Sequence, residues 1–217
     1  MAKINLAYPK IPDSKNSPFN KPCIAFEKYD GTNLHWVWDS ELKWYGFGTR
    51  RDRFDLDEQG IAEFNKAHQG LEEASELFLE DFSSQLEAIF LENPKYQSCS
   101  EIVVFTEFFG ANSFAGMHKK EDPKELVLFD VQTNTDIISP EEFVGDFQDL
   151  NIAEVVYRGK LTGKFKEDVR EGKYNVTEGV ICKGGKGDSL WMVKIKTYAY
   201  LEKLKQAFKD DWEKYWE

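Results

Sequence analysis

The stretch Glu27-Lys28-Tyr29-Asp30-Gly31-Thr32-Asn33 places a lysine at the end of a predicted strand and directly before a turn. The apolar run Ile24-Ala25-Phe26 predicts the strand, and Asp-Gly is a dipeptide typical of tight turns. A charged lysine in such a corner costs free energy unless it is paired. Taken alone, the stretch also fits a surface lysine before a β-turn, which is a common arrangement. The surrounding sequence therefore has to decide between the two interpretations.

The segments around this corner predict a mixed α+β fold dominated by antiparallel sheet. Short runs rich in aromatic and β-branched residues predict strands at 23–29, 34–38, 43–48, Ile102–Glu107, Leu126–Val131, 154–158, 178–183 and 190–196. Three other segments predict helices. They are 57–92, with apolar residues at helical spacing; the segment after the capping box Ser139-Pro140-Glu141-Glu142; and the tail from Tyr198.

Two further segments are predicted to connect or cover these elements. The glycine-rich segment 183–189 is predicted to form the loop of a hairpin between the last two strands, and residues 1–22 are predicted to form an arm that wraps the domain.

Length and composition indicate a globular protein. The chain has 217 residues, of which 41% are hydrophobic and 31% charged, and we expect a single domain over residues 1–217 because no convincing linker interrupts it. No apolar run approaches the roughly eighteen residues that a membrane span needs, and the N-terminus lacks a secretory signal. The three cysteines form no CxxC pair, which argues against a disulfide framework or a cysteine zinc site. We therefore expect a cytoplasmic protein.

Charge is distributed unevenly along the chain. The 28 basic and 39 acidic residues give a net charge of −11, which at first disfavours a nucleic-acid partner. Residues 55–92 contain eleven acidic residues and one lysine, whereas 158–196 contain ten basic and five acidic residues. A polyanion could meet the basic segment while the acidic segment faces away. The alternative is that both segments are simply solvated faces.

Several familiar catalytic patterns do not occur in this sequence. There is no GxSxG motif, and Gly185-Lys186 does not form a phosphate-binding loop because glycine follows the lysine. The histidines at 35, 68 and 118 are too scattered in the sequence to indicate a metal cluster.

Six short motifs, in order, resemble those of the covalent nucleotidyltransferases, which include ATP- and NAD-dependent ligases and mRNA capping enzymes. Lys28-Tyr29-Asp30-Gly31 resembles the KxDG motif that carries the reactive lysine of this superfamily. The others are Arg50 in motif Ia, with Arg51 as an alternative, Thr106–Gly110 in motif III, Leu128–Asp130 in motif IIIa, Glu178–Ile181 in motif IV and Trp191–Lys196 in motif V. Asn33 and the early Tyr8-Pro9-Lys10-Ile11 are most similar to the ATP-dependent RNA ligase branch.

The resemblance implies a fold and a reaction. The fold is a nucleotidyltransferase (ATP-grasp-like ligase) domain, in which two antiparallel sheets flank a nucleotide groove and helices lie at the periphery. The reaction joins RNA 5′-phosphate and 3′-hydroxyl ends through a lysyl-AMP intermediate and an adenylylated 5′ end. ATP is the co-substrate, and Mg²⁺ or Mn²⁺ is the metal.

The resemblance also implies roles for individual residues. Lys28 is the catalytic nucleophile, and the expected nucleotide-binding set is Glu27, Asp30, Gly31, Asn33, Arg50, Glu107, Phe129, Glu178, Lys194 and Lys196. Glu107 is expected to bind a ribose hydroxyl, Phe129 to stack on adenine, and Glu178 to bind the metal or orient Lys28. Asn33 and Arg50 are expected to handle the 5′-phosphate, Asp30 and Gly31 to shape the corner, and Glu27 to read adenine chiefly through its backbone.

These residue types suit the reaction chemically. An attacking lysine must be neutral, and at a pKa of about 10.4 only about one amine in 2,500 is neutral at pH 7, a handicap of ~4–5 kcal/mol. Lys194 and Lys196 share one face of a strand, so both can enter one groove, oppose protonation of Lys28 and bind the α-phosphate. A divalent metal would help neutralise the triphosphate.

Each candidate also has a structural interpretation. Phe129 could belong to the core, Lys194 and Lys196 to the wet face of a strand, and Glu178 to a turn, whereas a half-buried Glu107 would need partners. About twenty residues follow Lys196, so we expect neither an OB-fold nor a C-terminal RNA-binding domain. RNA would then be bound by this domain itself, through self-association or with an accessory partner.

Three alternatives to an RNA ligase stay open. They are a minimal DNA ligase, a GTP-using guanylyltransferase, and, from another class, a non-catalytic nucleotide- or RNA-binding module. Compact ligases of this kind occur in phages and other viruses as well as in cells.

Overall fold

The computed structural model describes residues 7–134 and 136–214. The chain divides into two compact units, each built on one antiparallel sheet. Unit 1 comprises Met1–Pro9, Gly31–Ile138 and Glu142–Ile152, and unit 2 comprises Lys10–Asp30, Ser139–Glu141 and Ala153–Glu217. The prediction of a mixed α+β fold with two antiparallel sheets is confirmed.

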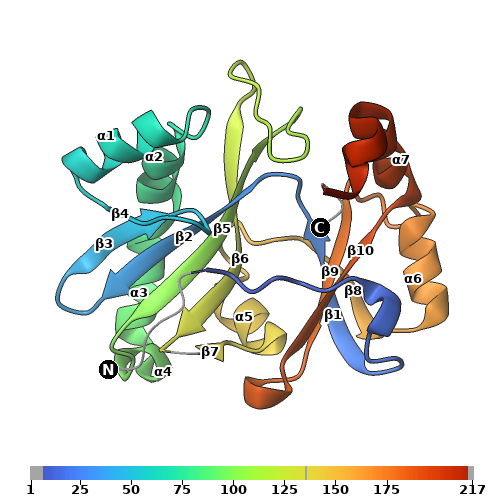
Figure 1. Cartoon of the computed structure of the whole chain (residues 1–217). Coiled ribbons are helices and arrows are strands. Elements are labelled where there is room, and N and C mark those ends of the chain that lie inside the picture. The colour runs from blue at the N-terminus through green and yellow to red at the C-terminus, as the bar shows by residue number, and fades with distance from the viewer. Residues whose placement is uncertain (1–6, 135, 215–217) are drawn as a thin grey trace. The chain divides into compact units, whose positions relative to one another are not determined.

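Unit 1 contains a six-stranded sheet with the order β4-β3-β2-β5-β6-β7 (Figure 1). Its strands are β2 (Thr32–Asp39), β3 (Lys43–Gly48), β4 (Phe54–Asp55), β5 (Ile102–Gly110), β6 (Lys124–Thr133) and β7 (Asp136–Ile137). Its helices are α1 (Glu58–Ala67), α2 (Ala74–Phe78), α3 (Ser84–Glu92), α4 (Pro94–Gln97) and most of α5 (Pro140–Phe147). The predicted strands and helices of this region are therefore present.

Aromatic side chains form the core of unit 1. Trp36 of β2 stacks against Phe47 and Phe78, with ring centroids 5.3 and 4.0 Å apart. Its indole N–H donates to the Thr106 hydroxyl at 2.8 Å, so the one polar group of this buried side chain has a hydrogen-bond acceptor. The helical periodicity predicted for 57–92 exists, but α1 ends at Ala67 and Gly70 adopts a φ of +94° before α2 begins. His68 caps the end of α1, and the left-handed Gly70 then turns the chain toward α2.

Unit 2 contains a four-stranded sheet with the order β10-β9-β1-β8 (Figure 1). The strands are β1 (Pro22–Lys28), β8 (Val155–Lys160), β9 (Gly179–Gly184) and β10 (Trp191–Lys196), and the helices are α6 (Gly163–Arg170) and α7 (Tyr198–Phe208). One face of the sheet packs on α6 around Phe165, Val169 and Val193. The predicted β9–β10 hairpin and the tail helix are confirmed, whereas α6 was not predicted.

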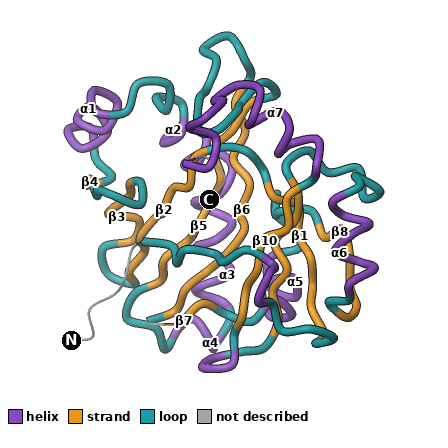
Figure 2. The backbone as a smooth tube through the Cα atoms, turned by 45° about the vertical axis from the view of Figure 1, so that its right-hand side comes forward, coloured by secondary structure: helices purple, strands orange, loops and turns teal. Residues whose placement is uncertain are grey.

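The N-terminal arm of unit 2 lies along the edge strand β10 (Figure 2). Asp13 pairs with Lys194 in a parallel bridge, and the Lys194 backbone N–H donates to the Pro12 carbonyl at 2.9 Å. The arm therefore shields part of an otherwise exposed strand edge. The predicted wrapping is confirmed for this segment, and the start of the predicted arm, residues 1–6, lies outside the described residues.

In the described part of the chain, no helix combines the length and the apolar character needed to cross a membrane.

Candidate active site

Lys28 and Lys196 lie on one row of the unit 2 sheet. The β1–β9 register places Lys28 opposite Gly179, and the β9–β10 register places Lys196 opposite the same glycine. Directly opposed residues project from the same face of a sheet, so both lysines extend over Gly179. A Cβ at Gly179 would lie 2.0 Å from the Ile195 carbonyl oxygen, and the backbone φ of Gly179 is +154°. Only glycine fits between the two lysine-bearing strands here.

Glu178 joins the two lysines. Its Oε2 lies 2.9 Å from Lys28 Nζ, and its Oε1 lies 3.0 Å from Lys196 Nζ. The exposed fractions of the three side chains are 3% for Glu178, 7% for Lys196 and 25% for Lys28. Burial lowers the pKa of Lys196, and the positive charge of Lys28 lowers it further, while Glu178 opposes both effects. The predicted cationic neighbour of Lys28 is present, and a carboxylate that stabilises both ammonium groups lies between them.

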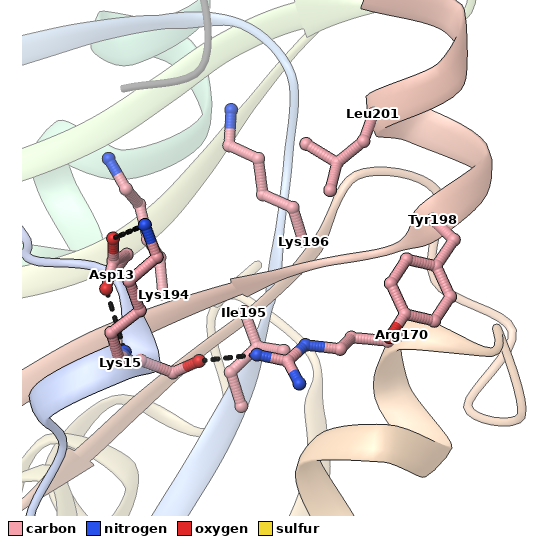
Figure 3. Close-up of a pocket in the computed structure, with 9 residues that line it drawn as sticks. Asp13, Lys15, Arg170, Lys194, Ile195, Lys196, Tyr198 and Leu201 are labelled. Carbon is pink, nitrogen blue, oxygen red and sulfur yellow. Dashed lines mark hydrogen bonds and ion pairs between the residues drawn. The ribbon is translucent and has the colours of Figure 1, made fainter. Parts of the chain in front are cut away.

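Lys194 belongs to the same face of β10. It is buried and sits two residues from Lys196, and its opposite residue on β9 is Ile181. Figure 3 shows the side chains of Lys194 and Lys196 extending in the same direction from the strand. The period-two argument made from the sequence is therefore confirmed for these two lysines.

Asp30 has a partner that the sequence did not indicate. The Tyr200 hydroxyl, from the first turn of α7, donates to Asp30 Oδ2 at 2.9 Å. The Tyr200 ring also lies 4.9 Å from Lys196 Nζ, within cation–π range. Tyr200 thus connects the Asp-Gly turn to the lysine pair. Its only sequence signal is a position near the start of an amphipathic helix.

Glu27 precedes Lys28 and projects to the other face of β1. Its backbone N–H donates to the Glu154 carbonyl at 2.8 Å, so this donor is engaged within the sheet. Burial raises the pKa of the Glu27 carboxyl. Its predicted contact with adenine stays a prediction.

In unit 1, the strand that follows the Asp-Gly turn packs directly on motif III. The Gly31 N–H donates to Glu107 Oε1 at 3.2 Å, and a Cβ on Gly31 would lie 2.3 Å from the Phe108 carbonyl oxygen. Asn33 lies opposite Glu107 in the β2–β5 register, so the two side chains share a face. The close approach of the Phe108 carbonyl therefore requires glycine at position 31. The half-buried Glu107 carboxylate has a hydrogen-bond donor, the Gly31 N–H, as a buried polar group needs.

Phe129 occupies a β-bulge. Phe105 pairs with Asp130 and the next residue, Thr106, pairs with Leu128, so Phe129 has no opposite residue in the ladder. Its side chain is half-buried, whereas the adjacent Leu128 and Asp130 are buried. Bulges redirect side chains and recur next to active sites. Phe129 is thus neither a simple core residue nor a regular strand residue, and periodicity alone could not show this.

Tyr8, in the N-terminal segment of unit 1, supports the bulge. Its ring meets Phe129 edge-on, with centroids 5.0 Å apart at 90°, and its hydroxyl donates to the Asp130 carboxylate. Burial and the Asp130 charge raise the pKa of Tyr8 well above its usual value, while the positive charge of Arg50 opposes the shift. Arg50 itself is exposed in the bend after β3. The structure therefore brings Tyr8, Arg50 and Phe129 into one neighbourhood, and the sequence had not marked Tyr8 as a site residue.

The chemistry of one divalent cation fits this residue set. Within residues 7–134 and 136–214, no three His, Cys, Asp or Glu side chains cluster as metal ligands. Mg²⁺ commonly uses only one or two carboxylates and completes its shell with water and substrate phosphates. Glu178 can supply that single carboxylate.

Comparison with known proteins identifies the fold. A family model described as RNA ligase matches residues 21–196. Comparison with curated proteins gives no match. Among solved structures, an archaeal ATP-dependent RNA ligase (form 2) has a TM-score of 0.62 and 17% identity over 94% of this chain.

Two further structures have the same fold. A mutant of the Naegleria gruberi RNA ligase with ATP and Mn has a TM-score of 0.60 and 16% identity over 91% of this chain. A putative ATP-dependent DNA ligase from Aquifex aeolicus has a TM-score of 0.59 and 19% identity over 96%. The matches cover 52%, 58% and 56% of these three proteins, so the chain spans little more than half of their length. Given the family match over residues 21–196 and the shared nucleotidyltransferase fold, the chain belongs to the RNA ligase family.

Proposed function

We propose that this chain is the adenylyltransferase domain of an ATP-dependent RNA ligase that joins 5′-phosphate and 3′-hydroxyl ends. The observation that carries the proposal is the buried arrangement of Lys28, Glu178 and Lys196 around Gly179, within a chain of the RNA ligase family. A reactive amine, a carboxylate and a second cation are the groups that nucleotidyl transfer to lysine needs.

The first step is the transfer of AMP to Lys28. The neutral Lys28 amine attacks the α-phosphorus of ATP, a phosphorus–nitrogen bond forms, and the bond to the β-phosphate oxygen breaks to release pyrophosphate. The amine loses its proton to solvent, which reaches Lys28 because its side chain is 25% exposed. Lys196 and Lys194 bind the α-phosphate and stabilise the charge that develops there.

Glu178 acts as an organiser of this step. It holds Lys28 and Lys196 by one carboxylate oxygen each. It is also the residue that would hold Mg²⁺ or Mn²⁺, which when bound supplies charge neutralisation for the triphosphate. A carboxylate that exchanges Lys28 for a cation would leave the amine free to lose its proton.

The nucleoside and the RNA end are assigned to the residues of unit 1. Phe129 on its bulge provides a ring for stacking on adenine, and Glu107 accepts a hydrogen bond from a ribose hydroxyl. Asn33 and Arg50 bind the 5′-phosphate in the two later steps, in which AMP moves to that phosphate and the RNA 3′-hydroxyl then displaces it. We assign the motif Ia role to Arg50 over Arg51 because Arg50 lies within electrostatic range of Tyr8 beside Phe129.

The test is intact-protein mass spectrometry after incubation with ATP and Mg²⁺, followed by peptide mapping. We expect one added AMP, located at Lys28, and none in Lys28→Ala. Lys21→Ala, an exposed lysine just before the same strand, should label like the wild type. Absence of any adduct in the wild-type chain, with ATP bound, would favour the non-catalytic binding module instead.

Two arms of the same experiment separate the enzymes of similar chemistry. Labelling by GTP in place of ATP would indicate a guanylyltransferase. Sealing of nicked DNA in preference to nicked RNA would indicate a DNA ligase, an alternative kept because a putative DNA ligase shares the fold.

RNA contact and location complete the proposal. We propose that the basic segment 158–196 supplies RNA contacts, aided by self-association or an accessory partner. Part of its charge is internally compensated, because Asp168 pairs with Lys164 and Lys173 at 2.5 and 2.7 Å. A cytoplasmic location agrees with three cysteines that are all buried and free.

A further inference from the structure

A pocket of unit 2 lies beside the motif V strand, and its lining extends beyond Lys194 and Lys196, the two lysines that the proposed adenylylation step uses. It has a volume of about 160 Å³ and is lined by the arm (Asp13, Ser14, Lys15), by Arg170 of α6, by β10 and by the start of α7 (Figure 3). That volume is well above the roughly 10–15 Å³ that one water molecule needs, so the pocket has room for a small anion. We call it the arm pocket.

Contacts between the arm and the sheet build this pocket in advance of any ligand. The arm is fixed to β10 by the hydrogen bond from the Lys194 N–H to Pro12, and Asp13 accepts the Lys15 N–H at 2.7 Å. Buried Ser14 accepts a hydrogen bond from Arg170 Nη2 at 3.4 Å through its hydroxyl. A preformed site loses less entropy on binding than one that must be ordered.

The lining of the arm pocket favours an anion. Lys15 and Arg170 line it together with the carboxylate of Asp13, which lies 3.8 Å from Lys15 Nζ, so these three side chains carry a net positive charge. Arg170 contacts Ser14 and Glu167 at 3.4 Å and also bonds the Tyr198 hydroxyl, so these three groups share the five donors of its guanidinium. Guanidinium and ammonium groups are the donors that recognise phosphate.

The position of the pocket separates it from the Lys28 network. In Figure 3 the nitrogens of Lys194 and Lys196 extend away from Arg170, whose guanidinium lies near Ile195. Lys196 Nζ is engaged with Glu178 at 3.0 Å, on the side of the reacting amine. A phosphate bound between Lys15 and Arg170 is therefore a different phosphate from the one that Lys28 attacks.

We propose that the arm pocket binds a phosphodiester group of the RNA strand, an inference that rests on the proposed RNA ligase function. Lys15 is 77% exposed, so the pocket opens to solvent and a continuous chain can enter and leave it. The arm thereby acts as a clamp for the polynucleotide backbone, and the chain gains an RNA contact from a segment outside 158–196.

The test compares a pocket variant with a matched charge control. The pocket variant is Lys15→Ala/Arg170→Gln, and the control is Lys66→Ala/Lys120→Ala, which removes the same charge from exposed positions in unit 1. Binding of a nicked RNA duplex is measured by fluorescence anisotropy at several salt concentrations. Adenylylation by ATP without RNA is measured in parallel.

We expect the pocket variant to lose about five- to tenfold in RNA affinity per lost phosphate contact at 0.1 M salt, with a salt slope smaller by about one per contact. Adenylylation should stay within about twofold of the wild type, and the control should bind RNA with a smaller loss. If the double variant unfolds, Lys15→Glu carries the same test because this side chain is exposed.

Two results would overturn the inference. Equal RNA affinity for the pocket variant and the control would show that the pocket takes no RNA phosphate. Loss of adenylylation with unchanged RNA binding, together with wild-type binding of inorganic pyrophosphate that the variant lacks, would assign the pocket to the triphosphate instead. Failure of the proposed function looks different, because the wild-type chain would then form no lysyl-AMP at all.

Discussion

Replacing Glu178 by glutamine removes the shared counter-charge of Lys28 and Lys196 while keeping the size of the side chain. Lys196 is left with a buried ammonium group, because its side chain is only 7% exposed and its oxygen partner at 3.0 Å becomes neutral. Breaking a buried ion pair costs about 3–5 kcal/mol. Lys28 is 25% exposed and can be rehydrated, so we take the lower end, about 3 kcal/mol.

Calorimetry provides the assay, since it resolves the two units if they unfold separately. A loss of about 3 kcal/mol corresponds to a fall in Tm on the order of 6–12 °C for a chain of this size. The double variant Glu178→Gln/Lys196→Met removes both buried charges and should recover at least half of the loss. Glu167→Gln is the matched control, because this carboxylate is 45% exposed and its ion pair with Arg170 is long, at 3.4 Å. It should change stability by less than about 1 kcal/mol.

The pH dependence gives an independent check. The pKa of Lys196 is lowered from 10.5, so between the lowered pKa and 10.5 the unfolded chain binds more protons than the native chain. The free energy of unfolding therefore rises with pH through that range. Without the Glu178 charge the pKa of Lys196 is lowered further, so the free energy of unfolding of Glu178→Gln should begin to rise at a lower pH than that of the wild type. Two results would refute the reasoning. One is a free energy of unfolding of Glu178→Gln within about 0.5 kcal/mol of the wild type, and the other is a double variant whose loss of stability equals the sum of the losses of the two single variants.

Three further perturbations probe unit 1. Tyr8→Phe removes the hydrogen bond to the buried Asp130 carboxylate and should cost about 1.5–3 kcal/mol in urea unfolding. Gly31→Ala forces a Cβ to within 2.3 Å of the Phe108 carbonyl, so we expect a loss of about 1–3 kcal/mol together with reduced adenylylation in a gel-based AMP-transfer assay. Burial holds the pKa of His35 at about 4, below 6.5, so stability should fall by about 3 kcal/mol as pH drops from 6.5 to 4, and His35→Leu should flatten this dependence in urea titrations.

Matched variants give these three tests their controls. Tyr198→Phe alters an exposed hydroxyl and should change stability by less than about 0.5 kcal/mol. Gly145→Ala adds a Cβ with nothing within 4 Å on helix α5, and should stabilise by about 0.5–1 kcal/mol. A Gly31→Ala variant as active as Gly145→Ala would contradict the close approach inferred for the corner. An unchanged urea midpoint in Tyr8→Phe, or an undiminished pH slope in His35→Leu, would contradict the other two.

The sequence allowed most of the fold and the identities of the motif residues to be predicted, because both depend on local pattern. Alternation along β10 was enough to place Lys194 and Lys196 on one face. The pairing of Lys28 with Glu178 depends on the β1–β9 register, which involves residues 150 positions apart and leaves no local signal. Helix α6 was missed because only Phe165 and Val169 mark its buried face, too few for a periodicity.

The remaining features of the site arise from irregular or distant structure. Phe129 was predicted as a strand residue, but its bulge follows from a one-residue mismatch between β5 and β6 that no property of β6 alone reveals. Tyr200 reaches Asp30 within unit 2 and Tyr8 reaches Phe129 within unit 1, and both contacts arise only through tertiary packing. Sequence pattern thus predicted the candidate reacting groups, whereas the residues that support them became evident only from the tertiary structure.

The absence of a side chain at position 179 has a practical use for recognising relatives. Because the backbone of β10 occupies the space that any Cβ would need, a homologue with a larger residue at this place has to move β10, and with it Lys196, away from β9. A chain with every charged motif residue intact but without this glycine would then be a candidate for a protein that binds nucleotide and no longer transfers it. One neutral position could therefore distinguish enzymes from inactive descendants where the charged residues alone would not.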